Sequence, residues 1–185
     1  MNLEETLCNL PAPWSKVSVT LTDERWVSPE DPASNEWLIR EQLLRRRAAE
    51  AQLFPFKTNH ARPAAACATV ERRIASLMPF DICLLGMGPD GHVASLIPGA
   101  EGFETGSDPD NERRLCAVHA PGAAGSPDRL SLTTCGVLAS RRVILLIMGA
   151  DKQQVFREAK EGRGRSPVRH LLTQKKVPIQ VYWAP

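Results

Sequence analysis

The stretch from Asp81 to Ser95 limits what this chain can fold into more than any other part of its sequence. It reads Asp-Ile-Cys-Leu-Leu-Gly-Met-Gly-Pro-Asp-Gly-His-Val-Ala-Ser. The short apolar run from Ile82 to Leu85 predicts a buried strand. Three glycines follow within six residues, and the turn that they form ends at His92. A buried strand that runs into a glycine-rich turn is typical of an open α/β sheet.

This turn has the properties of a ligand site. In an open α/β sheet, ligands bind beyond the carboxyl ends of the strands, where the backbone turns into a helix. Glycines such as Gly88 and Gly91 let main-chain N–H groups approach an anion closely, and a helix N-terminus favours negative charge. Histidine suits general acid–base catalysis near neutral pH. We therefore interpret His92, with Asp90 beside it, as a catalytic candidate.

The composition fits one globular domain. The 185 residues are enough for a single core, and 43% of them are hydrophobic and 24% charged. A formal net charge of +2 gives no strong field toward nucleic acid or an anionic membrane, so we expect neither as a partner. The longest apolar run, Val143 to Met148, is too short to span a bilayer, and the acidic N-terminal stretch lacks the apolar region of a secretory signal.

The cysteines indicate a reducing compartment. They form no Cys-x-x-Cys pair, and an odd, scattered set is typical of free thiols in a cytoplasmic protein rather than of a disulfide framework or a zinc site. The five are Cys8, Cys67, Cys83, Cys116 and Cys135.

Strand-like and helix-like segments alternate along the chain. The predicted strands are Lys16–Leu21, Asp81–Leu85, Leu115–His119, Leu130–Thr133, Val143–Met148 and Val177–Trp183. The predicted helices are about 35–53, 63–77, 134–140, 152–161 and 167–172, with N-caps at Ser34 and Ser166 and a C-terminal stop at Gly162. Residues 98–112, rich in Gly, Pro, Asp and Glu, predict an exposed loop. This order predicts one α/β domain over residues 1–185 with a parallel sheet.

Polar side chains follow three of the predicted strands. Thr22-Asp23-Glu24-Arg25 follows the first, the glycine turn follows the second, and Gly149-Ala-Asp-Lys152 follows the most apolar one. Because the carboxyl ends of parallel strands meet at one edge of a sheet, we expect these three segments to lie side by side.

The cations in these segments predict the class of ligand. Arg25 and Lys152 are expected within reach of one anion beside His92, and Arg129 is a candidate for a third cation. Arginine offers a fork that matches phosphate oxygens, and lysine adds a mobile point charge. These residues indicate a phosphorylated small molecule, and by themselves they leave the reaction open.

Seven segments together resemble the 6-phosphogluconolactonase family, in the family's order from about Trp14 to the C-terminus. They are Asp23-Glu-Arg-Trp26, Ser34-Asn35, Leu84–Ser95, Arg129-Leu-Ser-Leu-Thr133, Gly149-x-x-Lys152, Pro167–Leu172 and Val181–Pro185. The resemblance implies a sugar-phosphate isomerase-like α/β fold, in which a three-layer, mostly parallel Rossmann-like sheet is flanked by helices. It also implies hydrolysis of 6-phosphogluconolactone to 6-phosphogluconate in the oxidative pentose phosphate pathway, with the phosphorylated sugar lactone as the small-molecule partner.

Glucosamine-6-phosphate deaminases share this fold and carry a similar glycine–Asp-Gly-His turn. Two contexts favour the lactonase. The first strand is followed by Asp-Glu-Arg-Trp instead of the deaminase Asp-Glu-Tyr type, and His92 is followed after Val93 by Ala-Ser-Leu-Ile-Pro instead of Ala-Phe-Asn-Glu-Pro. A deaminase or isomerase that acts on an amino-sugar phosphate stays open as an alternative.

The chemistry of lactone opening suggests roles for the matched residues. His92 is expected to take a proton from water and return one to the leaving ring oxygen, with Asp90 orienting the imidazole or the water. Backbone N–H groups of the turn from Gly88 to Gly91 are expected to hold the oxyanion. The candidates for substrate binding are Asp23, Arg25, Gly88, Gly91, Arg129 and Lys152. Asp23 has a structural alternative, in which it bonds N–H groups of its own loop. No metal or cofactor is expected.

The chain departs from the family pattern at its N-terminal end. Family members normally begin with a strand, a Ser-Gly-Gly-Ser/Thr-Pro loop that cradles phosphate, and a helix. Only fifteen residues precede the first predicted strand here, and none of them reads Gly-Gly-x-Pro. We therefore expect the first βα unit to be missing, phosphate affinity to be lowered, and an exposed sheet edge to favour self-association or filling by another chain.

Three functions stay open from the sequence. The chain is an active lactonase, a non-catalytic phosphosugar-binding relative, or an amino-sugar-phosphate deaminase. A natural start upstream of Met1 is a further alternative.

Overall fold

The structure is a computed structural model that describes residues 3–164 and 166–185. Its α-helices are α1 (Leu3–Leu7), α2 (Asn35–Gln42), α3 (Pro63–Ile74), α4 (Phe103–Ser107), α5 (Thr134–Leu138), α6 (Ala150–Lys160) and α7 (Pro167–Thr173). Its strands are β1 (Ser18–Thr20), β2 (Asp23–Arg25), β3 (Gln52–Phe54), β4 (Cys83–Gly86), β5 (Leu115–His119), β6 (Asp128–Leu132), β7 (Val143–Met148) and β8 (Ile179–Ala184). Three 3₁₀ turns are η1 (Trp14–Lys16), η2 (Arg46–Glu50) and η3 (Ala75–Leu77).

The strands form three sheets within the described residues. β4, β7 and β8 form a parallel sheet in that order, and β1 pairs with β3 in a second parallel sheet. The third sheet, β2-β6-β5, is antiparallel. The expected α/β architecture with parallel strands is confirmed. The antiparallel sheet is not predicted from the sequence. Asp23–Arg25 lacks an alternating apolar pattern and becomes a strand only through pairing with β6.

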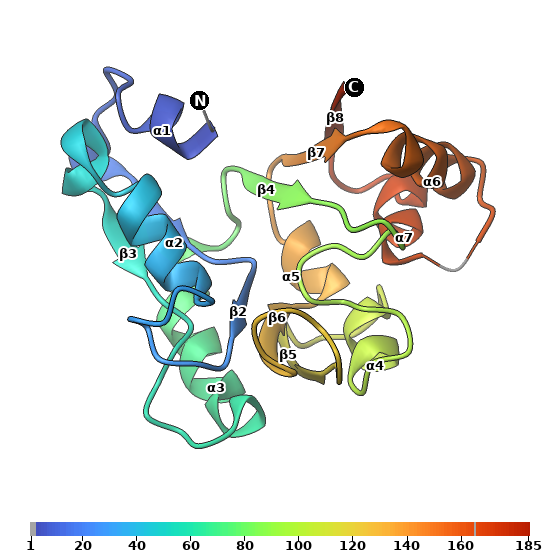
Figure 1. The fold of residues 1–185 in the computed structure, drawn as a ribbon, viewed down its shortest axis with the longest axis horizontal. Coiled ribbons are helices and arrows are strands. Elements are labelled where there is room, and N and C mark those ends of the chain that lie inside the picture. Colours follow the sequence, from blue (N-terminus) through green and yellow to red (C-terminus); the bar gives the residue numbers. More distant parts are fainter. Residues whose placement is uncertain (1–2, 165) are drawn as a thin grey trace.

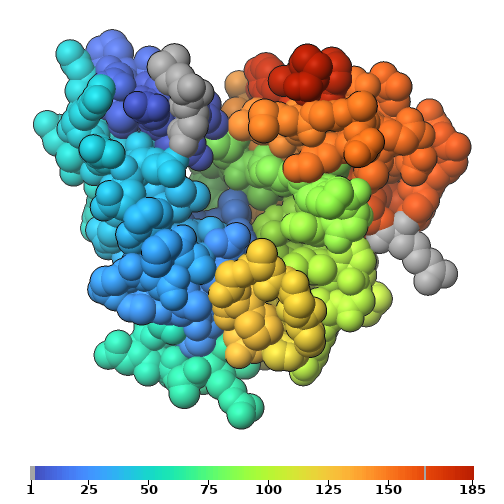
Figure 2. Space-filling model, viewed as in Figure 1, coloured from blue at the N-terminus to red at the C-terminus, as the bar shows by residue number. Residues whose placement is uncertain are grey.

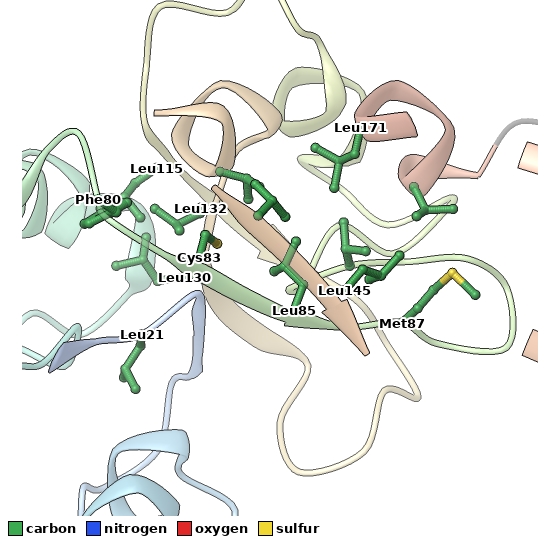
Figure 3. Close-up of a cluster of buried hydrophobic side chains, with 14 of the residues drawn as sticks. Leu21, Phe80, Cys83, Leu85, Met87, Leu115, Leu130, Leu132, Leu145 and Leu171 are labelled. Carbon is green, nitrogen blue, oxygen red and sulfur yellow. The ribbon is translucent and has the colours of Figure 1, made fainter. Parts of the chain in front are cut away.

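One apolar core connects the parts of the molecule. Alternate residues of β7 are buried, as a strand covered on one face requires, and Leu145 is 1% exposed. Figure 3 shows Leu85 and Leu145 together, with Leu130, Leu132 and Leu171 around them. Leu21, which follows β1, belongs to the same cluster. Burial of these side chains therefore holds β1 near β4, although no pair joins the two strands among the described residues.

Two predicted elements have different bounds in the structure. Ser34 caps α2 by accepting the Trp37 N–H at 3.2 Å, yet the helix ends at Gln42 rather than near residue 53. The residues beyond it form η2 and β3, because pairing of Gln52–Phe54 with β1 outweighs helix propensity. The predicted loop 98–112 contains α4, which buries Phe103.

The C-terminal elements agree closely with the prediction. α6 is followed by Gly162 at φ +76°, and α7 starts with Pro167. Ser166 stands at the N-cap position of α7, but its side chain makes no capping hydrogen bond. Because β4 and β7 are parallel, the His92 turn after β4 and the start of α6 after β7 lie at the same edge of the sheet (Figure 1).

Candidate active site

The turn after β4 holds the imidazole of His92 in one place. The carboxylate Oδ1 of Asp90 accepts the ring Nδ1–H over 2.6 Å and the backbone N–H of His92 over 3.1 Å. The side chains of His92 and Asp90 are 30% and 43% exposed, so water can reach both. The structure therefore places the Asp90 carboxylate in direct contact with the imidazole.

The N–H groups of both glycines are used inside this turn. The Gly88 N–H donates to the His92 carbonyl at 2.9 Å, and the Gly91 N–H donates to the Gly88 carbonyl at 3.1 Å. In this conformation the Gly88 and Gly91 N–H groups are both occupied, so an oxyanion held by the turn as it stands would have to use the Asp90 N–H.

Gly88 and Gly91 instead provide space and backbone freedom. A Cβ at Gly88 would stand 2.2 Å from Nδ1 and Cε1 of His92, so the imidazole lies directly against this glycine. Gly91 has φ +79°, and a Cβ there would stand 2.5 Å from the Cβ of Ser166. The Gly91 carbonyl accepts the Val168 N–H at 3.1 Å, which fastens the turn to α7.

A buried hydrogen-bond network connects this turn to β2 and β6. The Ser95 hydroxyl donates to Oδ2 of Asp23 at 2.6 Å and accepts from Nη1 of Arg129 at 3.3 Å. The Ser95 N–H donates to the Ser131 hydroxyl at 3.1 Å. Ser95 is fully buried and follows His92 by three residues, so this network fixes the segment that leaves the His92 turn.

The two arginines lie side by side. Arg25 on β2 is the register partner of Arg129 on β6. Nη1 of Arg25 donates to the Ala33 carbonyl at 2.6 Å, and Nε of Arg129 donates to the Ser126 carbonyl at 3.0 Å. Burial first, and the charge of Arg25 second, lower the pKa of Arg129, while Asp23 opposes this shift. Two guanidiniums beside one carboxylate leave excess positive charge, which suits a phosphate.

Lys152 lies in the first turn of α6. Within the described part of the chain, no side chain or carbonyl bonds its ammonium, which leaves it available to a ligand. Val155, one helical turn further on, lies 3.1 Å from where a Cβ of Gly91 would be. Residues three apart share a helix face, so Lys152 is on the face that meets the His92 turn.

Glu24 connects β2 to α2 beside the candidate site, a contact that the sequence did not reveal. It is fully buried, and its two carboxylate oxygens accept the N–H groups of Asn35 and Glu36 at 2.7 and 2.8 Å and the Ser34 hydroxyl at 3.0 Å. Burial raises the pKa of Glu24, and these hydrogen bonds act against the rise. The carboxylate fastens β2 to the start of α2 and so fixes the adjacent Arg25. The residues of this contact belong to two motifs noted in the sequence, Asp23–Trp26 and Ser34-Asn35. Their spacing along the chain does not show that the two motifs lie in contact.

The structure thus groups the predicted residues in two sets. Gly88, Asp90, Gly91 and His92 form the turn after β4. Asp23, Arg25 and Arg129 form a second group on β2 and β6, and Ser95, which had no predicted role, joins the two.

In residues 3–164 and 166–185, no three His, Cys, Asp or Glu side chains are arranged to hold a metal ion. None of the helices in these residues combines the length and apolar character that crossing a membrane requires.

Comparison with known proteins gives a consistent picture. Residues 2–183 match the family model of glucosamine-6-phosphate isomerases/6-phosphogluconolactonase. The chain is 40% identical to the 6-phosphogluconolactonase of Rhizobium meliloti over 175 residues, which cover 93% of this chain and 75% of the relative. It is 38% identical to the 6-phosphogluconolactonase of Mesorhizobium japonicum, over 97% of this chain and 75% of that protein.

Solved structures agree. The crystal structure of a 6-phosphogluconolactonase from Shewanella baltica superposes with a TM-score of 0.89 at 32% identity, over 97% of this chain and 77% of that one. A monomeric glucosamine-6-phosphate deaminase superposes with a TM-score of 0.69 at 22% identity, which shows a shared fold alone. From the family match, these identities and the shared fold, we conclude that this chain belongs to the glucosamine-6-phosphate isomerase/6-phosphogluconolactonase family.

Proposed function

We propose that this chain hydrolyses 6-phosphogluconolactone to 6-phosphogluconate, the lactonase step of the oxidative pentose phosphate pathway, with His92 as the general base. The observation that carries the proposal is the contact of 2.6 Å between Nδ1 of His92 and Oδ1 of Asp90 at the carboxyl end of β4. The names and the 33–40% identities of the curated relatives support the same reaction. The five free cysteines agree with a cytoplasmic location.

The proposed mechanism follows from the hydrogen bond between His92 and Asp90. When Nδ1–H donates to the carboxylate, Nε2 of the neutral ring keeps its lone pair. Nε2 takes a proton from a water whose oxygen attacks the lactone carbonyl carbon. The bond from that carbon to the ring oxygen then breaks, and the imidazolium returns the proton to the ring oxygen. The net change is one lactone and one water to one hydroxy acid, and acid–base catalysis of this kind contributes about 10²–10⁴-fold.

The cations hold the other end of the substrate in this proposal. Arg25, Arg129 and Lys152 bind the phosphate and hydroxyl groups and place the carbonyl carbon at His92. Asp23 belongs to the same site. It accepts the hydrogen bond of Ser95, and its negative charge offsets part of the repulsion between Arg25 and Arg129. The carbonyls that already accept from both arginines fix the guanidinium positions before substrate arrives.

The test measures lactone hydrolysis by the purified chain with a dehydrogenase-coupled assay, against the spontaneous rate. His92→Ala should abolish turnover. His119→Ala is the matched control, because Nδ1 of His119 also contacts a carboxylate, Oδ1 of Asp128 at 2.7 Å, outside the site. This control should keep wild-type turnover.

Two results would contradict the proposal. Turnover by His92→Ala at the wild-type rate would remove His92 as the base. A folded wild-type chain that binds 6-phosphogluconate but gives no turnover above background would be a non-catalytic relative. Ammonia release from glucosamine 6-phosphate tests the deaminase alternative in the same samples.

A further inference from the structure

A polar hollow lies where the loop after β3 meets one face of α3. It has a volume of about 520 Å³. Its lining is made of polar side chains, which are Lys57, Thr58, Asn59, His60, Thr69 and Arg73. Two of these are cations, and none of them is a carboxylate. Figure 2 shows this part of the chain in turquoise, below the blue N-terminal part. The hollow therefore presents net positive charge to whatever enters it.

The ammonium of Lys57 is held without an acidic partner in the hollow. It lies 4.1 Å from the centroid of the Trp26 ring, and its side chain is half-buried. Burial lowers the pKa of Lys57, and the negative charge of Glu24 acts against this shift. The Glu24 carboxylate itself is bonded to the start of α2 and does not line the hollow. The indole thus fixes the position of the ammonium and leaves its N–H groups free for an acceptor.

The guanidinium of Arg73 is fixed in a similar way. Its Nη1 donates to the Pro55 carbonyl and, at 3.2 Å, to the Lys57 carbonyl, which fastens the loop to α3. In the part of the chain that the structure describes, no carboxylate forms an ion pair with Lys57 or Arg73. Thr69 lies one helical turn before Arg73 and adds a hydroxyl on the same face of α3. A fixed guanidinium that lacks a carboxylate partner suits the oxygens of a phosphate.

The loop side chains are ordered by bonds of their own. The Thr58 hydroxyl contacts Nδ1 of His60 at 2.8 Å, and the His60 carbonyl accepts Nε1–H of Trp26 at 3.1 Å. Trp26 directly follows Arg25 on β2, so the indole connects the hollow with the candidate active site. Arg25, Arg129 and Lys152 do not line the hollow, which makes it a separate place on the molecule.

We propose that this hollow is a second anion site, which binds the phosphate group of a small polar molecule between Lys57 and Arg73. A phosphate ester carries a charge of about −1.5 to −2 near neutral pH, which two cations balance. Small-molecule sites have volumes of roughly 300–1,000 Å³, so the hollow has room for a polar body beside the phosphate. Thr58, Asn59 and His60 line the hollow where hydroxyl groups of that body would bind. This inference does not depend on the proposed reaction.

The test titrates ribose 5-phosphate into the isotope-labelled chain and follows the amide and indole N–H signals by NMR. The Trp26 indole and the Thr58 and His60 amides should shift together and give one Kd, while the amides of residues 90–92 report the candidate active site separately. Ribose should shift none of the first group. Inorganic phosphate distinguishes the two sources of the anion. An affinity about tenfold or more below that of the ester assigns the hollow to a phosphate ester, and an equal affinity assigns it to free phosphate.

Three variants test the role of Lys57. Lys57→Gln should weaken binding in the hollow by about tenfold or more, because a hydrogen bond from a charged donor is lost, and should leave the shifts of residues 90–92 unchanged. Lys57→Arg keeps a cation over the indole and should retain the ligand. Arg72→Gln is the matched control, because Arg72 is exposed on α3 and does not line the hollow.

Three results would overturn the proposal. In the first, Lys57→Gln binds as well as Arg72→Gln. In the second, the shifts are confined to the candidate active site. In the third, sodium chloride at the same ionic strength reproduces the shifts of the Trp26 indole, which would show screening of charge and no bound phosphate.

Discussion

The Oδ1 atom of Asp90 accepts both the ring Nδ1–H and the backbone N–H of His92, at 2.6 and 3.1 Å. One carboxylate oxygen therefore fixes the orientation of the imidazole and the turn that bears it. In the proposed reaction, a negative partner also stabilises the imidazolium that forms when His92 takes a proton from water.

Asp90→Asn should lower kcat for the lactone with little change in KM. The amide keeps the shape of the side chain but loses the negative charge, so we expect a loss of about 10- to 100-fold, a part of the acid–base contribution. Asp128→Asn, which alters the equivalent partner of His119, is the control and should keep full activity. An Asp90→Asn enzyme with wild-type kcat would show that Asp90 is a bystander.

Gly88→Ala should inactivate by displacing the imidazole. The added methyl group would stand 2.2 Å from two ring atoms of His92, so the ring must leave its present position. We expect kcat/KM to fall about 10-fold or more. Gly86→Ala is the matched control on the same segment, because a Cβ there meets nothing within 4 Å. Steady-state kinetics of both variants, with thermal unfolding to establish folding, decides the question. Equal activity of the two variants would contradict the structure of this turn.

Ser95→Ala should destabilise the protein and uncouple the two parts of the site. The hydroxyl is buried and connects Asp23 with Arg129, and its loss leaves a half-buried carboxylate oxygen of Asp23 without this donor. We expect the free energy of unfolding to fall by about 1–2 kcal/mol. Urea unfolding of Ser95→Ala, Asp23→Asn and the double variant measures their coupling. A coupling within error of zero would mean that the two groups do not interact in solution.

The sequence was sufficient for the elements whose pattern is local. The apolar run Val143–Met148, the Pro167 start of α7 and the Gly162 stop after α6 each depend on a few neighbouring residues. The Asp90–His92 contact is also local, since the partners are two positions apart. Local features of this kind depend on neighbouring residues in the sequence and not on where the segment packs in the fold.

Contacts between distant segments were not predictable. The bond from Ser95 to Asp23 spans 72 positions, and Glu24 meets Asn35 only because β2 pairs with β6 and packs beside α2. The predicted helix over about 35–53 runs into β3, because Gln52–Phe54 become a strand only through pairing with β1. In each case, tertiary contacts decide between local alternatives of similar free energy.

Alkaline pH should destabilise the fold through two buried thiols. Burial raises the pKa of Cys83 and of Cys116 from 9.0 to about 12, while a hydrogen bond with Ser140 acts against the rise at Cys83 and the nearby Cys67 adds to it at Cys116. Because the folded pKa lies above the unfolded one, the unfolded state loses its protons first. The thiol contribution to stability is therefore complete below about pH 9 and is lost as the pH rises through 12.

The expected loss between pH 7 and pH 10 is about 1 kcal/mol for each thiol. Urea unfolding at both pH values measures it, and the double variant Cys83→Ala/Cys116→Ala separates the thiols from lysines and other alkaline groups. This variant is less stable at pH 7 because its core has lost two sulfur atoms, but its stability should fall less between the two pH values. Iodoacetamide at pH 8 provides an independent check, since both thiols should react only after unfolding, whereas the partly exposed Cys135 reacts in the folded chain. An identical pH dependence for wild type and double variant would mean that these thiols titrate normally in the folded protein.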